Sequence, residues 1–88
     1  MNKYQTKFVI ECITNQKPIM YRLTIVTHET IIVEELLEFI KKLKTNYHEK
    51  IADELFKKFG GKQTMIANHH GVLIKTKRYK WDAISNTE

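Results

Sequence analysis

The chain has 88 residues, of which 42% are hydrophobic and 28% charged, with three glycines and one proline. This length accommodates one domain, residues 1–88, and excludes a second one. Fifteen Lys and Arg against ten Asp and Glu give a net charge of +5, which favours anionic partners such as nucleic acid. A domain this small has a limited core, so we expect it to assemble into a homo-oligomer.

Cys12 is the single cysteine. One thiol excludes an intramolecular disulfide and a zinc site built on paired cysteines, and a free thiol is typical of the cytoplasm. No apolar run reaches the length of a membrane span, and residues 1–7 are too polar for a signal peptide. We therefore expect a cytoplasmic protein with no membrane partner.

Residues 4–13 alternate as in a strand, with Phe8, Ile10 and Cys12 in one phase. The polar segment 14–18 interrupts this pattern, and residues 19–27 resume it, which predicts a hairpin. Cys12 ends the first strand beside a polar turn. It is either a buried core residue or a nucleophile at the mouth of a pocket.

Two helices are predicted next, because apolar residues recur at helical spacing in residues 33–43 and again up to a stop signal at Gly60. Asn46 is the expected N-cap of the second helix, with Glu49 as its capping-box partner. His48 lies near the middle of this helix's apolar arc and Glu49 just outside it. His48 is therefore a core or a pocket histidine, and Glu49 either caps the helix or reaches a pocket edge.

Residues 63–67 and 72–77 read as short strands around the turn 68–71, in which Asn68 and Gly71 suit a positive φ. The order ββααββ predicts an α+β domain with an antiparallel sheet and both helices on one face. The expected core covers about residues 4–79, and we expect the tail 80–88 to be flexible unless Trp81 docks. We expect the adjacent His69 and His70 to point apart, and no pair of histidines has metal-ligand spacing, so no metal site is predicted.

Three segments in this order resemble the QueF and QueF-like family of tunnelling-fold (T-fold) enzymes, which act on the nitrile of 7-cyano-7-deazaguanine. The family has a cysteine after its first core strand in a turn like CPxTGQPDF, and residues 12–21 read CITNQKPIMY. Its FHE motif before a helix like NxIxxDL corresponds to YHE at residues 47–49, and its PRGGISID strand to NHHGVLIK at residues 68–75. The resemblance covers about residues 8–77. It implies a T-fold that oligomerises into a barrel.

By this resemblance, Cys12 adds to the nitrile as a thioimide, and His48 and Glu49 recognise the deazaguanine, as free base or within nucleic acid. The family's Asp after the proline is Ile19 here, which leaves His48 as the nearest proton donor. The ESKSLK segment that the family uses for NADPH corresponds only to VEELLE, residues 33–38. We therefore expect no cofactor, with ammonia converting the thioimide to a formamidine, as in archaeosine-type and queuosine-related modification.

Two alternatives remain open. The first is an NADPH-dependent 7-cyano-7-deazaguanine reductase, which forms the aminomethyl product. The second is a non-catalytic, basic nucleic-acid-binding module with Cys12 as a core residue. Its docking residues would be Lys75, Lys77, Arg78, Tyr79, Lys80 and Trp81. A pterin-type T-fold with zinc-binding histidines fits the spacing less well.

Overall fold

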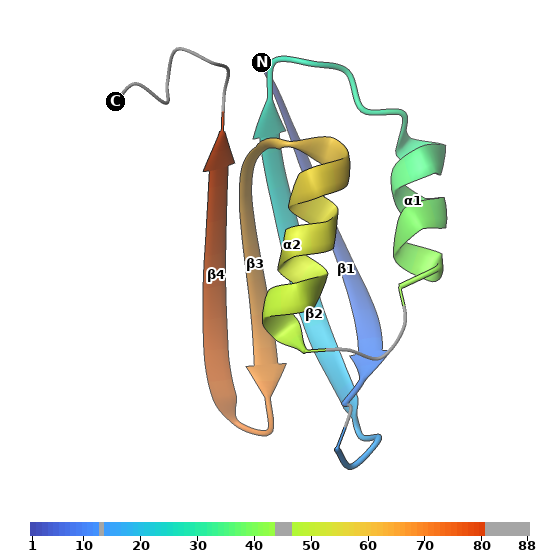
Figure 1. The fold of residues 1–88 in the computed structure, drawn as a ribbon, viewed down its shortest axis with the longest axis vertical. Coiled ribbons are helices and arrows are strands. Elements are labelled where there is room, and N and C mark those ends of the chain that lie inside the picture. Colours follow the sequence, from blue (N-terminus) through green and yellow to red (C-terminus); the bar gives the residue numbers. More distant parts are fainter. Residues whose placement is uncertain (13, 44–46, 81–88) are drawn as a thin grey trace.

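The structure is a computed structural model that describes residues 1–12, 14–43 and 47–80. Its element order is β1 (Asn2–Glu11), β2 (Pro18–Thr27), α1 (Val33–Lys41), α2 (His48–Phe59), β3 (Gly61–His69) and β4 (Val72–Lys80). The strands form one antiparallel sheet in the order β1-β2-β3-β4 (Figure 1). This confirms the predicted α+β class and the ββααββ order. Within the described ranges, no helix is long and apolar enough to cross a bilayer.

The apolar side chains of the first hairpin face the helices. In the register of β1 and β2, Phe8 lies opposite Tyr21 and Ile10 opposite Ile19, and all four side chains are buried. The intervening residues are exposed, as the alternation predicted. The strand ends at Glu11, so Cys12 directly follows it, and residue 13 of the predicted strand lies outside the described residues.

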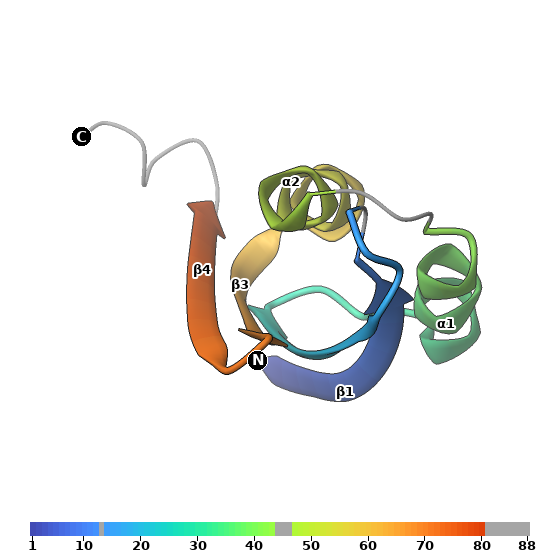
Figure 2. The ribbon, with the colours of Figure 1, turned by 90° about the horizontal axis from the view of Figure 1, so that it is seen from below.

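Both helices lie on the same side of the curved sheet, as predicted (Figure 2). α2 buries Ile51, Ala52 and Leu55, and α1 buries Leu36. The two helices meet through Phe39 and Phe59, which are half-buried against the core. Their ring centroids are 5.5 Å apart in an edge-to-face arrangement. The core therefore fills the space between one face of the sheet and the helix pair.

The start of α2 differs from the prediction. Tyr47 occupies the N-cap position and makes no side-chain capping hydrogen bond. Asn46, the expected cap, lies outside the described residues. Glu49, the expected capping-box partner of Asn46, forms an ion pair with Arg78 of β4. This charge-assisted contact joins the first turn of α2 to the neighbouring strand.

The second hairpin is longer than predicted, and its turn is tighter. β3 and β4 are joined by only two residues, His70 and Gly71, with φ of 57° and 95°. Two consecutive positive φ values are typical of a type I′ turn, whose twist matches that of the flanking strands. The prediction that Asn68 adopts a positive φ is therefore wrong. Asn68 belongs to β3, and its Oδ1 accepts a hydrogen bond from the Gly71 N–H at 2.9 Å.

The C-terminal boundary also shifts. β4 extends to Lys80, so the first residue of the expected flexible tail belongs to the sheet instead. Gly61 lies opposite Lys80 and Gln63 opposite Arg78. Residues 81–88, including Trp81, lie outside the described residues.

Candidate functional site

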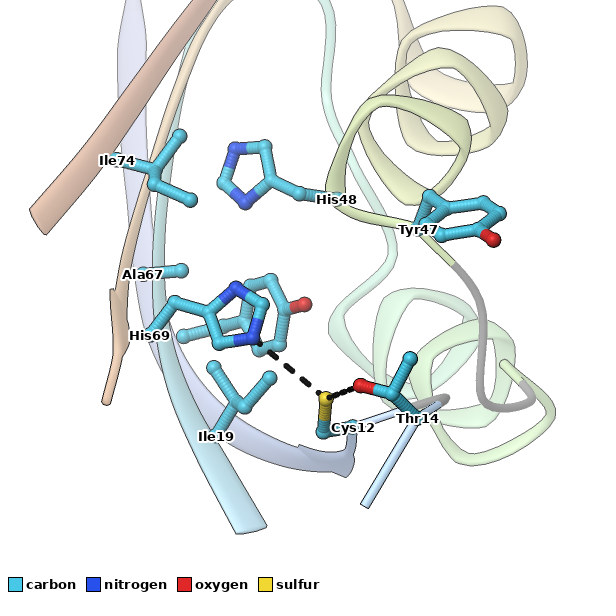
Figure 3. Close-up of a pocket in the computed structure, with 9 residues that line it drawn as sticks. Cys12, Thr14, Ile19, Tyr47, His48, Ala67, His69 and Ile74 are labelled. Carbon is cyan, nitrogen blue, oxygen red and sulfur yellow. Dashed lines mark hydrogen bonds between the residues drawn. The ribbon is translucent and has the colours of Figure 1, made fainter. Parts of the chain in front are cut away.

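A pocket of about 170 Å³ lies between the sheet and the first turn of α2, at the end of the sheet that carries both hairpin turns (Figure 3). The pocket wall is mostly apolar, and it also carries the reactive side chains of Cys12, His48 and His69. The lining residues are Cys12, Thr14, Ile19, Tyr21, Tyr47, His48, Ala67, His69 and Ile74. Pockets for drug-sized ligands measure about 300 to 1,000 Å³. This pocket therefore suits a small ligand.

The turn after β1 holds Cys12 in place at the pocket wall. The Cys12 N–H donates to the carbonyl of Lys17 at 2.8 Å, and the Cys12 carbonyl accepts from the Gln16 N–H at 2.9 Å. Asn15 Oδ1 accepts from the Lys17 N–H at 3.0 Å, which tightens the turn further. Cys12 as a residue is only 3% exposed to solvent. Its thiol is thus positioned by backbone hydrogen bonds and faces the pocket.

The surroundings of the Cys12 thiol favour its ionised form. Its Sγ lies 3.1 Å from Thr14 Oγ1 and 3.5 Å from His69 Nε2. The Thr14 hydroxyl, then the Asn15 N–H and the His70 side chain, lower the pKa of Cys12 to about 5, against a small opposing effect of burial. The thiolate therefore predominates at neutral pH, and it is the reactive form of cysteine in nucleophilic attack.

His69 and His70 close the site from the second hairpin. The expectation that they point apart is wrong, because their ring centroids are 4.5 Å apart. His69, at the end of β3, reaches Cys12, while His70 Nε2 lies 3.1 Å from Asn15 Nδ2 in the first turn. One ligand atom from each of Cys12, His69 and His70 lies within 4.8 Å of the others. This thiolate and two imidazoles could hold a soft divalent cation such as zinc.

His48 projects from the first turn of α2 into the pocket wall. Its ring stacks on Tyr21 at 5.7 Å, and Tyr21 stacks in turn on Phe8 at 5.2 Å. The Nε2 atom of His48 is hydrogen-bonded to Thr76 Oγ1, whereas its buried Nδ1 has no hydrogen-bond partner. Burial is the main effect that lowers the pKa of His48, which keeps the imidazole neutral. Nδ1 is thus a buried polar atom with no hydrogen-bond partner, which is rare in folded proteins.

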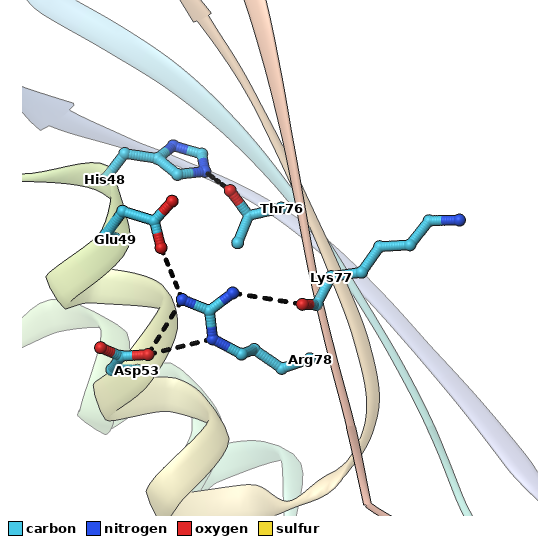
Figure 4. Close-up of polar contacts among 6 residues, drawn as sticks. All are labelled: His48, Glu49, Asp53, Thr76, Lys77 and Arg78. Atoms are coloured by element: carbon cyan, nitrogen blue, oxygen red, sulfur yellow. Dashed lines mark hydrogen bonds and ion pairs between the residues drawn. The ribbon is translucent and has the colours of Figure 1, made fainter.

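Glu49 lies outside the pocket wall. Its side chain is 72% exposed, and Oε1 is 2.6 Å from Arg78 Nη2 (Figure 4). The same guanidinium also contacts Asp53 Oδ1 at 3.0 Å. Arg78 therefore reaches from β4 to α2, on the helix side of the sheet. The nucleic-acid-binding alternative placed Arg78 among the docking residues with Lys75 and Lys77. In the structure Arg78 lies on the opposite side of the sheet from these two lysines.

The structure thus brings together two of the three predicted site residues, Cys12 and His48, and leaves Glu49 beside them. The residue that sequence reasoning missed is His69. Comparisons with models of known protein families, with curated proteins and with solved structures found no match. The arrangement of these side chains is therefore the basis for proposing a function.

Proposed function

We propose that the chain is a cysteine-dependent enzyme that converts the nitrile of 7-cyano-7-deazaguanine to a formamidine with ammonia. The observation that carries this proposal is the Cys12 sulfur in a small pocket with His69 Nε2 3.5 Å away. A nitrile carbon is an electrophile that a thiolate can attack. The sequence resemblance to QueF-like enzymes supplies the identity of the nitrile.

In the first step, Cys12 Sγ adds to the nitrile carbon and one π bond of the nitrile breaks. The electron pair moves to the nitrile nitrogen, which takes a proton to give a neutral covalent thioimide. His69 is the better proton donor, because its ring contacts the attacking sulfur, whereas His48 Nε2 is already bonded to Thr76. This assignment replaces the expectation that His48 donates the proton.

In the second step, ammonia adds to the thioimide carbon, and the carbon–sulfur bond breaks. The product is the formamidine, and Cys12 leaves as a thiolate while the surplus proton from ammonia returns to His69. The low pKa of Cys12 favours this step as well, because a stabilised thiolate is a good leaving group. No hydride is transferred, so the proposed reaction requires no NADPH.

Recognition of the base is assigned to His48 and the apolar wall. The buried Nδ1 of His48 has no partner, and a ligand polar atom would satisfy it. Tyr21, Ile19 and Ile74 give a flat aromatic ring apolar contacts. Glu49 is exposed at the start of α2, where it can contribute to a site only from outside this pocket wall.

Assembly could bring such a contribution from a second copy of the chain. β1 and β4 are the edges of the described sheet, and each presents one side without a strand partner. Unpaired edges favour pairing between copies. We therefore propose a cytoplasmic homo-oligomer in which sheets pair into a barrel and Glu49 of one copy approaches the pocket of its neighbour.

The test is turnover of 7-cyano-7-deazaguanine with ammonium chloride, with the product followed by liquid chromatography and mass spectrometry. We expect the formamidine from the wild type and none from Cys12→Ser, while Lys57→Gln on the exposed face of α2 retains full activity. Chelator-treated protein is assayed in parallel, because a metal ion on Cys12 would block the nucleophile. An aminomethyl product that depends on NADPH, or turnover by Cys12→Ser, contradicts the proposal.

A further inference from the structure

The face of the sheet that points away from the helices is strongly cationic. Strand alternation places Lys7, Arg22 and Lys75 on this face, and all three are exposed. They form a row across the sheet, since Lys7 pairs with Arg22, Arg22 with Ile66, and Ile66 with Lys75. Three further exposed lysines extend the row in the same phase. We call this set the cationic face, and it comprises Lys3, Lys7, Arg22, Lys62, Lys75 and Lys77.

Charges of opposite sign are segregated from the cationic face. Among the described strands, its only acidic residue is Glu11, which lies at the end opposite Pro18. The other acidic side chains of the described residues lie in α1, in α2 and at Glu29 in the connection before α1. The ion pairs found among the described residues involve Arg78 on the helix side and none of the cationic face. The chain's net positive charge is therefore concentrated on one surface.

We propose that the cationic face binds the phosphate backbone of double-stranded nucleic acid. Neighbouring strands lie about 4.8 Å apart, and alternate residues along a strand about 6.7 Å apart. Cations on this grid meet phosphates that carry one negative charge per about 1.7 Å of duplex axis. Lysines that contact phosphates give affinity without reading sequence.

The composition of the face favours a duplex over a single strand. Single strands are bound through aromatic side chains on which exposed bases stack, in addition to basic residues. Tyr79 is the one aromatic residue that the described strands present on this face. A surface with many cations and few stacking groups suits a duplex, whose bases are already stacked internally.

This surface is independent of the Cys12 pocket. The pocket residues lie on the helix side of the sheet (Figure 3), and strand alternation places the cationic face on the other side. Binding of a duplex therefore does not require a functional nucleophile. The proposed barrel is compatible with this inference only if the cationic face remains accessible to a duplex. A wild-type protein with no affinity for a duplex therefore overturns the inference without affecting the enzymatic proposal.

The experiment measures fluorescence anisotropy of a labelled 20-base-pair duplex, titrated with the full chain at several salt concentrations. If about four of the six cations contact phosphates, log affinity falls with log salt with a slope of about −3.6. Affinity then drops about 150-fold between about 50 and 200 mM salt. The triple variant Lys7→Gln, Arg22→Gln and Lys75→Gln removes the central row, and we expect its slope to become shallower by about 2 to 3.

The matched control is the triple variant Lys50→Gln, Lys57→Gln and Lys58→Gln, which removes the same charge from exposed positions on α2. We expect it to bind the duplex nearly as the wild type does. Equal losses in both variants, or tighter binding to an unpaired strand of the same length, would overturn the proposal. Circular dichroism checks that both variants are folded.

Two further variants separate this proposal from the enzymatic one. Cys12→Ala should bind the duplex with unchanged affinity. The cationic-face triple variant should react normally with the free nitrile base. Loss of duplex binding in Cys12→Ala would show that the cationic face is not the binding surface and overturn this inference.

Discussion

The thiol of Cys12 and the imidazole of His69 lie 57 positions apart in the sequence, and their Sγ and Nε2 atoms are 3.5 Å apart. Each residue stands at the end of a strand where a hairpin turns. Because β2 lies between β1 and β3 in the sheet, both turns emerge at the same end. The antiparallel topology therefore assembles a nucleophile and an imidazole from two separate hairpins.

The ionisation of Cys12 should be visible in its rate of alkylation. We expect the rate with iodoacetamide to rise with pH through a midpoint near 5 and then level off. In urea-unfolded protein the midpoint should return toward the ordinary value of 9.0. Thr14→Val removes the hydroxyl that contributes most to the lowered pKa, so its midpoint should lie above that of the wild type. A folded-state midpoint near 9 would contradict this description of the site.

The role of His69 as proton donor predicts a large loss of turnover in His69→Gln. Removing a general acid typically lowers the rate by about 10² to 10⁴-fold. His70→Gln serves as the comparison, because His70 adjoins His69 and also lowers the pKa of Cys12, while its Nε2 pairs with Asn15. We expect a smaller loss in this variant. A His69→Gln enzyme with nearly normal turnover would require another donor, such as the Thr14 hydroxyl, whose Oγ1 lies 3.1 Å from Cys12 Sγ.

The buried environment of His48 predicts that its imidazole resists protonation. Since burial lowers its pKa, its titration midpoint by NMR should fall below the ordinary value of 6.5. Thr76→Val removes the partner of Nε2 and leaves both ring nitrogens unpaired, which should cost about 1 to 3 kcal/mol of folding stability. Urea unfolding at pH 7 measures this cost. An undiminished stability would show that the hydrogen bond is dispensable.

Glu49 offers a test that separates a structural role from recognition of a substrate. Its ion pair with Arg78 is largely exposed, so Glu49→Gln should change the free energy of unfolding by only about 0.2 to 1 kcal/mol. If Glu49 also binds the base in a neighbouring copy, the same variant should raise KM strongly. Asp53→Asn removes the other carboxylate on Arg78 and is the matched control. Equal kinetic effects in both variants would limit Glu49 to its ion pair.

The mass of the protein in solution tests the proposed homo-oligomer directly. Open edges on β1 and β4 predict a species several times the mass of the 10.5 kDa chain by light scattering. Proline at an edge position that faces the neighbour should lower that mass, because proline removes a backbone donor. A sharply monomeric wild type would contradict the proposed barrel.

The sequence predicted the elements well where side-chain periodicity is strong. Phe8 and Ile10 alternate with exposed residues, and the apolar residues around Leu55 recur at helical spacing. Both patterns arise because the buried side chains repeat with the period of the strand or the helix. Boundaries were less predictable, because they depend on interactions between elements. Glu49 forms an ion pair with Arg78 of β4, and a local sequence motif cannot indicate a partner that is so distant in the chain.

The site was predictable in part for the same reason. The position of His48 on the apolar arc of α2 predicted a core or a pocket histidine, and the structure places it in the pocket wall. The sequence predicts a turn over residues 68–71 that contains both His69 and His70, and this turn is longer than the observed one. Only the two-residue connection with a positive φ at His70 brings His69 to the end of β3 and next to Cys12.

Intact-mass spectrometry of the protein mixed with 7-cyano-7-deazaguanine tests the central claim most directly. Without ammonium, the wild type should gain the mass of one nitrile base, and Cys12→Ala should gain nothing. Adding ammonium should remove the adduct and release the formamidine. A wild-type protein that shows no adduct and no product, with and without chelator, would contradict the account.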